Sequence, residues 1–243
     1  MQRTHNLHPL FTPHDPTMTP LAPIEIETGP QPTASVIVLH GLGADGHDFV
    51  PVCEALRLGA VGAVRFVLPH AAEMPVTING GYVMPAWYDI RDGDLAQRED
   101  EAGLRRSQTV IQALIDRERS RGVASNRIVL MGFSQGGAMT LMTGLRCAET
   151  LAGLVCLSGY LPLADKTTAE RHAANAATPV FMAHGRQDPV VPLPRANASR
   201  EALAALGQPV AWHDYAMEHE VCPQEITDLN RWLLKALAQP IAG

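Results

Sequence analysis

The sequence predicts an α/β fold with a mostly parallel central sheet and helices on both faces. Short apolar runs rich in valine, isoleucine and leucine alternate along the chain with longer segments of helical periodicity. This alternation favours parallel strands joined by crossover helices, which cover both faces of the sheet. With 243 residues, 46% of them hydrophobic, the chain can bury a large core, and we expect one domain.

The predicted strands are apolar runs of about five residues. The first ends at His40-Gly41 and the second at Pro69, where glycine and proline interrupt a strand. In chain order, the predicted strands are 35–39, 64–68, 128–131, 153–157, 179–183 and 209–213.

The predicted helices lie between these strands, at 49–58, 101–119 and 195–206, and after the last strand from Pro223 onward. Gly122 and Gly207 predict the ends of two of them, because glycine readily takes the left-handed conformation that closes a helix. Pro223 suits a first helical turn, where no N–H donor is needed. The apolar positions on one face are Leu104, Ile111, Leu114 and Ile115 in the second helix, and Ile226, Leu229, Leu233 and Leu237 in the last.

The sequence Gly132-Phe133-Ser134-Gln135-Gly136-Gly137 contains the pattern G-x-S-x-G, between a predicted strand and a segment, 138–142, that can continue as a helix. This pattern is typical of a nucleophile elbow, a sharp turn that projects a serine hydroxyl above the end of a sheet. The turn holds the serine at strained backbone angles, and glycines at both flanks avoid steric collisions. Ser134 is therefore the predicted nucleophile. A glycine-rich turn without a catalytic role is the alternative.

A serine hydroxyl is a weak nucleophile, so Ser134 needs a base to take its proton and a carboxylate to orient that base. In proteins with a nucleophile elbow, these partners follow the serine in the order acid, then histidine. Asp188 lies in the loop after the 179–183 strand and is the predicted acid. Asp165 and Asp214 are the alternatives, and both are expected to make local hydrogen bonds.

His219 is the predicted base. It lies in the loop between the last strand and the last helix, where the chain order requires the histidine. His213 is the alternative, but it falls within the last strand and is expected to pack there or to meet solvent.

Attack on a carbonyl creates a negative oxygen, which needs backbone N–H donors that are fixed in advance. Gln135 supplies one such donor at the start of the helix after Ser134. The second is expected from Leu42, in the glycine-rich loop 40–46, where the backbone can approach a ligand closely. The alternative for this loop, a phosphate-binding turn, lacks the G-x-G-x-x-G spacing and the P-loop lysine.

These motifs together resemble the carboxylesterase, lysophospholipase and acyl-protein thioesterase family of small α/β hydrolases. The resemblance extends from about Ala34 to the end of the chain. It implies an α/β-hydrolase fold with no large cap domain, no cofactor, and an ester or thioester of a small molecule as substrate. It also implies that Trp87 lines one wall of the acyl site, although burial in the ordinary core is an equal alternative. The resembling segments are 39–46, 75–81, 84–90, 132–137, 184–188, His219 and 221–223.

The leading prediction is a serine carboxylesterase that hydrolyses esters of short to medium acyl chains through an acyl-enzyme. The segment 71–94 is expected to be mobile and to shape an apolar acyl pocket. An acyl thioesterase or a lysophospholipase would use the same three side chains. A hydrolase scaffold that binds a ligand or a partner protein without turnover is the alternative from another class.

Glu218 departs from the family pattern, which usually has glycine just before the histidine. If this position requires a positive φ, a glutamate there strains the loop that carries His219.

Composition excludes several classes of partner. The formal net charge of −6 and the lack of a dense lysine and arginine run argue against nucleic acid. No apolar stretch approaches the roughly 18 residues that span a bilayer, so no integral membrane association is expected. Cys53, Cys147, Cys156 and Cys222 are widely spaced without C-x-x-C, which predicts reduced thiols in a cytoplasmic protein and no metal site. The oligomeric state is left open, with a homodimer as one alternative.

Residues 1–17 are rich in proline, histidine and threonine and show no periodicity. We expect them to be a flexible leader or a mis-assigned start, with Met18 as the native initiator. Residues 18–243 are then a single α/β-hydrolase domain.

Overall fold

The central element of the computed structural model is a seven-stranded sheet, and the structure describes residues 21–93, 95 and 98–238. The strands run in the order β1-β3-β2-β6-β7-β8-β9, and only β1 is antiparallel to its neighbour. The predicted mostly parallel sheet is therefore confirmed, and so are all six predicted strands. The leader predicted at 1–17 lies outside the described residues. The strands are β1 Ile24–Glu27, β2 Ala34–Leu39, β3 Val64–Leu68, β6 Ile128–Phe133, β7 Gly153–Leu157, β8 Val180–Gly185 and β9 Val210–Tyr215.

Helices follow most of these strands, and their bounds agree closely with the sequence signals. Gly122 and Gly207 have φ of +91° and +74°, so both take the left-handed conformation expected after a helix. The first helix is shorter than predicted, because Leu56 already has an extended backbone. The helices are α1 Val50–Ala55, α2 Glu101–Ser120, α3 Gln135–Gly144, α4 Ala164–Glu170, α5 Leu193–Ala205 and α6 Pro223–Leu237, with single 3-10 turns at Gly59–Val61, Thr77–Asn79, Ser125–Arg127 and Ala173–Asn175.

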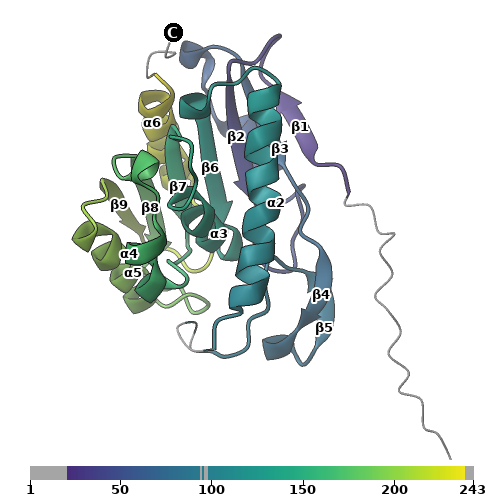
Figure 1. The fold of residues 1–243 in the computed structure, drawn as a ribbon, viewed down its shortest axis with the longest axis vertical. Coiled ribbons are helices and arrows are strands. Elements are labelled where there is room, and N and C mark those ends of the chain that lie inside the picture. The colour runs from purple at the N-terminus through teal and green to yellow at the C-terminus, as the bar shows by residue number, and fades with distance from the viewer. Residues whose placement is uncertain (1–20, 94, 96–97, 239–243) are drawn as a thin grey trace, which may run out of the picture.

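The sheet separates two hydrophobic cores. Successive side chains of a strand point to opposite faces, so Ile37 and Leu39 join one core while Val36 and Val38 join the other. The first core contains the apolar faces of α2 and α3, which cross the near face of the sheet in Figure 1. The second contains those of α1 and α6. Both faces of the sheet are therefore covered, as the sequence predicts.

A two-stranded hairpin that the sequence signals did not predict lies beside the main sheet. It is formed by β4 Glu73–Val76 and β5 Tyr82–Pro85, within the segment that was expected to be mobile. Figure 1 shows it at one edge of the molecule, near the N-terminal end of α2. Within the described residues, the segments between the main strands hold only this hairpin and the helices, with no large cap domain.

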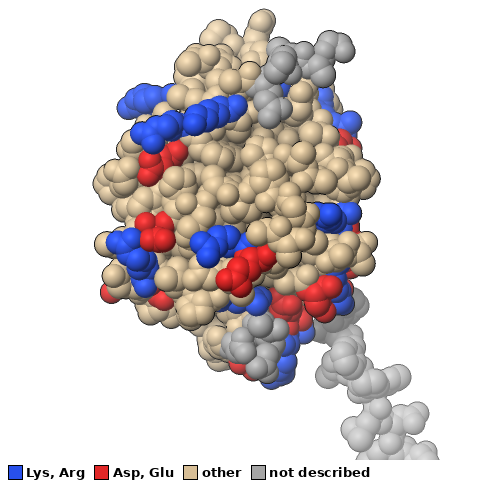
Figure 2. Space-filling model, turned by 90° about the vertical axis from the view of Figure 1, so that its left-hand side faces the viewer, with Lys and Arg blue, Asp and Glu red and all other residues tan. Residues whose placement is uncertain are grey.

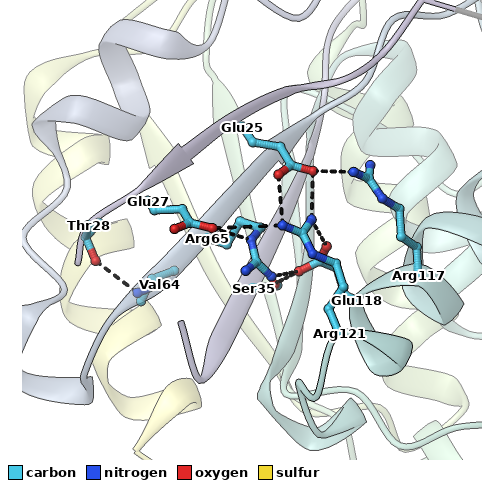
Figure 3. A network of polar contacts seen from close by, with 9 residues as sticks. All are labelled: Glu25, Glu27, Thr28, Ser35, Val64, Arg65, Arg117, Glu118 and Arg121. Atoms are coloured by element: carbon cyan, nitrogen blue, oxygen red, sulfur yellow. Dashed lines mark hydrogen bonds and ion pairs between the residues drawn. The ribbon is translucent and has the colours of Figure 1, made fainter. Parts of the chain in front are cut away.

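The C-terminal end of α2 is attached to the antiparallel edge of the sheet by buried charges. The Glu118 side chain is fully buried, and its carboxylate accepts hydrogen bonds from Arg65 at 2.8 Å, Arg121 at 3.0 Å and the hydroxyl of Ser35. Figure 3 shows Ser35 of β2, Arg65 of β3 and Arg121 meeting this carboxylate, with the two glutamates of β1 on the outer side of the arginines. Arg65 also pairs with Glu27 of β1 at 2.8 Å. The network joins four elements far from one another in sequence.

Candidate active site

Ser134 occupies the turn between β6 and α3 and has φ 54° and ψ −118°. This positive φ is rare for a residue with a side chain, and it gives the strained turn that the G-x-S-x-G pattern predicts. The turn is also crowded. A Cβ at residue 132 would overlap with the carbonyl oxygen of Gly136, and a Cβ at 136 would overlap with that of Leu39. Only glycine fits at either flank of Ser134.

Three side chains from separate segments meet at this turn. The Nε2 atom of His219 lies 2.9 Å from the Ser134 hydroxyl oxygen, and its Nδ1 atom lies 2.7 Å from the Asp188 Oδ2 atom. Ser134 follows β6, Asp188 follows β8, and His219 follows β9, so all three lie at the carboxyl ends of parallel strands. The structure thus brings together the three residues that the sequence motifs select.

Asp188 is held by its own loop. Its side chain is fully buried, and its Oδ1 atom accepts hydrogen bonds from the backbone N–H groups of Val190 and Val191, both at 2.8 Å. His184 is close to the other oxygen, with Nε2 at 3.4 Å from Oδ2 and 2.8 Å from the Val191 carbonyl. Burial lowers the pKa of His184, so its neutral ring donates from Nε2. The carboxylate therefore keeps one oxygen directed at His219.

The loop that carries His219 packs against the loop that carries Asp188. A Cβ at Gly185 would overlap with the carbonyl oxygens of Glu218 and Met217, so glycine is required for this close approach. The backbone N–H of Gln187 donates to the Met217 carbonyl at 3.1 Å. Glu218 is exposed and is not among the residues with positive φ, so the condition under which it would strain this loop is not met.

The alternative acids and base lie elsewhere. The His213 ring stacks on Phe181, with ring centroids 4.8 Å apart. Asp214 pairs with Arg186 at 2.7 Å, and Asp165 is an exposed residue in the first turn of α4. The packing of His213 and the hydrogen bond of Asp214 are the local roles that the sequence analysis expects, whereas a local hydrogen bond of Asp165 stays a prediction.

The loop at 40–46 lies directly against the serine turn. A Cβ on Gly41 would be 3.5 Å from the Cβ of Ser134. The N–H of Gly43 donates to the carbonyl of Pro85 at 2.9 Å, which joins this loop to the hairpin. Within the described residues, the N–H groups of Leu42 and Gln135 donate to no other protein group. Both donors are therefore available to a ligand.

Trp87 follows the hairpin and is only 3% exposed. It belongs to the core beneath α2 and α3, and its indole N–H donates to the carbonyl of His40 at 2.9 Å. This burial favours the core alternative, whereas contact with an acyl chain stays a prediction. The sequence motifs gave no sign of the hydrogen bonds that surround this residue, because its partners lie about 47 residues away on either side.

Other features limit what the molecule can bind. Cys53, Cys147 and Cys156 are buried free thiols and Cys222 is a partly exposed one. In the described part of the chain, no group of three or more histidine, cysteine or acidic side chains could hold a metal ion. None of the described helices is long and apolar enough to cross a bilayer.

On the face in Figure 2, lysine and arginine form small groups, several beside acidic residues, separated by uncharged surface. This face lacks the continuous basic surface typical of nucleic-acid binding.

Comparison with known proteins gives one consistent result. The model of the family described as phospholipase/carboxylesterase matches residues 22–237. The chain is 42% identical to acyl-protein thioesterase 1 of Gibberella zeae over 227 residues, covering 89% of this chain and 96% of that protein. It is 41% identical to acyl-protein thioesterase 1 of Neurospora crassa, covering 84% and 87%.

Solved crystal structures also resemble this chain over most of its length. The crystal structure of SOBER1 from Arabidopsis thaliana has a TM-score of 0.80 at 26% identity and covers 84% of this chain and 99% of that one. Acyl-protein thioesterase 2 from Zea mays has a TM-score of 0.77 at 26% identity, covering 88% and 99%. The similarity therefore extends over nearly the full length of both structures.

Proposed function

The chain belongs to the phospholipase/carboxylesterase family and is a serine hydrolase of the α/β-hydrolase fold, and from this premise we propose that it hydrolyses acyl thioesters and carboxylic esters. The observation that carries the proposal is the line of contacts from Ser134 through His219 to Asp188. We assign Ser134 as nucleophile, His219 as general base and acid, and Asp188 as the carboxylate that orients His219.

Acylation begins with the proton of the Ser134 hydroxyl, which passes to Nε2 of His219 as the serine oxygen bonds to the substrate carbonyl carbon. The π electrons of the carbonyl move to its oxygen and create a negative charge. Asp188 accepts the hydrogen bond from Nδ1–H and so keeps Nε2 of His219 facing the serine. The intermediate collapses by breaking the bond to the thiolate or alkoxide, which takes the proton from His219.

Water then repeats the sequence on the acyl-enzyme. Nε2 of His219 takes a proton from water, the oxygen of water bonds to the acyl carbon, and the bond to Ser134 breaks with return of the proton. The product is a carboxylic acid. In both halves, the N–H groups of Leu42 and Gln135 are the proposed donors to the negative oxygen, where losing one donor costs about 2.7–4 kcal/mol.

Two considerations favour thioesters as the first substrate class. The curated relatives at about 40% identity are named acyl-protein thioesterases. A thiolate is also a weaker base than an alkoxide, so it leaves with less help from the proton on His219. Esters of short to medium acyl chains are the second class, supported by the family description. A cytoplasmic location, a homodimer and a single domain from residue 18 onward stay predictions.

The test uses esters and thioesters that carry the same acyl chain, from four to sixteen carbons. The value of kcat/KM reports acylation, where the two classes differ, whereas deacylation is common to both. We expect higher kcat/KM for the thioester at each length. The Ser134→Ala variant should lose activity toward both, and Ser120→Ala, on the exposed end of α2, should keep it.

Two outcomes would contradict the proposal. If Ser134→Ala hydrolyses these substrates as fast as the wild type, Ser134 is not the nucleophile. If the wild type hydrolyses none of them yet binds the acyl compounds, the scaffold is a binding protein.

A further inference from the structure

The two proposed oxyanion donors come from different parts of the chain. Leu42 lies in the loop after β2, and Gln135 is the first residue of α3. Donors of this kind stabilise a transition state only if their relative positions are fixed before the reaction. The contacts around Trp87 identify the structure that fixes them.

On the side of the first donor, Trp87 holds the residue where the loop begins. Its indole N–H donates to the carbonyl of His40 at 2.9 Å, and the two rings pack with centroids 5.2 Å apart. The His40 ring is itself fixed. Its Nε2 atom accepts from the N–H of Ala71 at 3.0 Å, so its proton is on Nδ1, which donates to the carbonyl of Gly41 at 2.7 Å. Burial lowers the pKa of His40, which keeps the ring in this neutral form.

On the side of the second donor, the side chain of Gln135 binds the backbone on both sides of the Trp87–Tyr88 peptide. The N–H of Trp87 donates to Oε1 of Gln135 at 2.8 Å, and Nε2 of Gln135 donates to the carbonyl of Tyr88 at 2.7 Å. Gln135 is 2% exposed, so water does not compete for this amide. The residue that supplies the proposed donor is thus attached to Trp87 at two points.

Trp87 is also anchored from a third direction. Its carbonyl accepts a hydrogen bond from the hydroxyl of Ser107 on α2. A residue tied to the 40–46 loop, to α3 and to α2 has little freedom to move.

We propose that Trp87 is a positioning residue that sets the distance between the N–H groups of Leu42 and Gln135. The connection consists of hydrogen bonds in series. They run from the His40 carbonyl through the indole and the backbone N–H of Trp87 to the side-chain amide of Gln135. This inference rests on the proposed function and gives Trp87 a role other than lining the acyl site. Breaking either link leaves both N–H groups in the protein but frees one to drift from the other.

Two variants break one link each. Trp87→Phe removes the indole N–H and keeps an aromatic ring against His40. Gln135→Met removes both amide hydrogen bonds and keeps the backbone N–H and a side chain of similar size. Trp212→Phe is the matched control, because it also loses an indole hydrogen bond, to Asp214 at 3.2 Å, within β9 of the main sheet.

Three measurements separate positioning from other roles. The first is kcat/KM for an acyl thioester. The second is Ki for a trifluoromethyl ketone with the same acyl chain, which Ser134 attacks to give a bound negative oxygen. The third is Kd for the matching thioether, which has no carbonyl and reports binding of the acyl chain alone. Because the donors act on the transition state, we expect kcat/KM to fall and Ki to rise by the same factor, about 10-fold to 100-fold, with Kd unchanged.

The double variant tests whether these hydrogen bonds act in series. Once one link is broken, loss of the other should lower kcat/KM little further. The Trp87→Phe/Gln135→Met protein should therefore have the kcat/KM of the less active single variant, and not a loss equal to the product of both effects. Trp212→Phe should keep wild-type values. If Trp87→Phe does not fold, as judged by circular dichroism, Gln135→Met carries the same three measurements.

The outcomes distinguish the inference from the proposed function. Wild-type kcat/KM in both single variants would overturn the inference, and so would multiplied effects in the double variant. A rise of thioether Kd in proportion to the loss of kcat/KM would assign Trp87 to the acyl wall instead. Failure of the wild type to hydrolyse any thioester or ester, or full activity of Ser134→Ala, would overturn the proposed function itself.

Discussion

At the scale of single residues, the arrangement depends on points where the backbone of one loop touches another. Gly185 is such a point, because the carbonyl of Glu218 occupies the space where a side chain would begin. The residue has no positive φ, so its glycine is required by proximity and not by conformation. The contact determines how closely the His219 loop approaches the loop of Asp188.

Adding one methyl group at this point should therefore disturb catalysis. We predict that Gly185→Ala lowers kcat by at least about 10-fold, since a displacement of about 1 Å can cost 100-fold when reacting groups lose alignment. The matched control is Gly59→Ala, where nothing lies within 4 Å of the new Cβ and φ is not positive. Steady-state kinetics of both variants is the measurement. Equal activity of Gly185→Ala and the wild type would show that the two loops adjust freely.

At the scale of elements, two buried carboxylates differ in how completely they are paired. Glu118 is fully paired, with Arg65, Arg121 and Ser35, and it attaches α2 to the edge of the sheet (Figure 3). Glu225, in the first turn of α6, is also fully buried, but among the described residues its carboxylate accepts a single hydrogen bond, at 3.4 Å from the N–H of Cys222. Its other oxygen has no partner among the described residues.

Removing the charge of Glu118 should be costly. A buried pair that loses one partner leaves the other charge without compensation, and this typically costs about 3–5 kcal/mol. We predict a loss of about 3 kcal/mol in the free energy of unfolding for Glu118→Gln, measured by urea denaturation. Asp116→Asn, an exposed acid on the same helix that pairs with Arg119, should change it by less than about 0.5 kcal/mol. Similar small losses for both variants would show that the network in Figure 3 contributes little.

Glu225 should make stability depend on pH. Burial raises its pKa to about 8, whereas an unfolded glutamate has a pKa of about 4.3. Between these values the folded protein holds a proton that the unfolded chain has released, so the free energy of unfolding falls as pH rises. The Glu225→Gln variant stays neutral and lacks this loss. We predict that the free energy of unfolding of the variant gains at least about 1 kcal/mol on that of the wild type between pH 5 and pH 9.

Urea denaturation at pH 5, 7 and 9 measures this difference. Glu220→Gln is the control, because Glu220 is exposed in the preceding loop and should leave the pH dependence of the wild type intact. Parallel pH curves for Glu225→Gln and the wild type would exclude a proton on the folded glutamate.

At the scale of the whole molecule, the sheet divides the interior into two hydrophobic cores, one on each of its faces. Ile111 of α2 belongs to one and Leu233 of α6 to the other. We predict losses of about 0.5–1.5 kcal/mol for Ile111→Val and about 2–5 kcal/mol for Leu233→Ala. The two should add within about 0.5 kcal/mol in the double variant, as expected for sites without shared partners. A larger coupling, measured by urea denaturation, would mean that strain passes through the sheet.

The sequence was sufficient for the parts of the fold that repeat a simple pattern. Runs such as 35–39 and 64–68 are buried on both faces and, apart from Ser35 and Arg65, apolar, which makes them visible as strands. The hairpin at 73–85 was missed because its strands are four residues each, have half of their residues exposed, and contain Pro75 and Pro85. β1 was missed for a related reason, since it is a short edge strand in which isoleucine alternates with glutamate.

The same distinction applies to the candidate active site. Ser134, Asp188 and His219 could be selected from the sequence because each chemical role requires a residue type in a fixed chain order. The sequence could not predict the hydrogen bonds made by His40, Trp87 and the Gln135 side chain. An indole or amide that bonds to a distant backbone group leaves no local pattern in the sequence. Such contacts depend on the packing of the whole sheet.

The tight backbone contacts also have a consequence for laboratory evolution of substrate selectivity. Randomised libraries that include 132, 136 or 185 would consist largely of inactive clones, because no side chain fits at those three positions. Ile78, Tyr82 and Val83 project from the hairpin into solvent, so they tolerate diversity without disturbing the interior. An engineer would mutate the hairpin first and leave those glycines fixed.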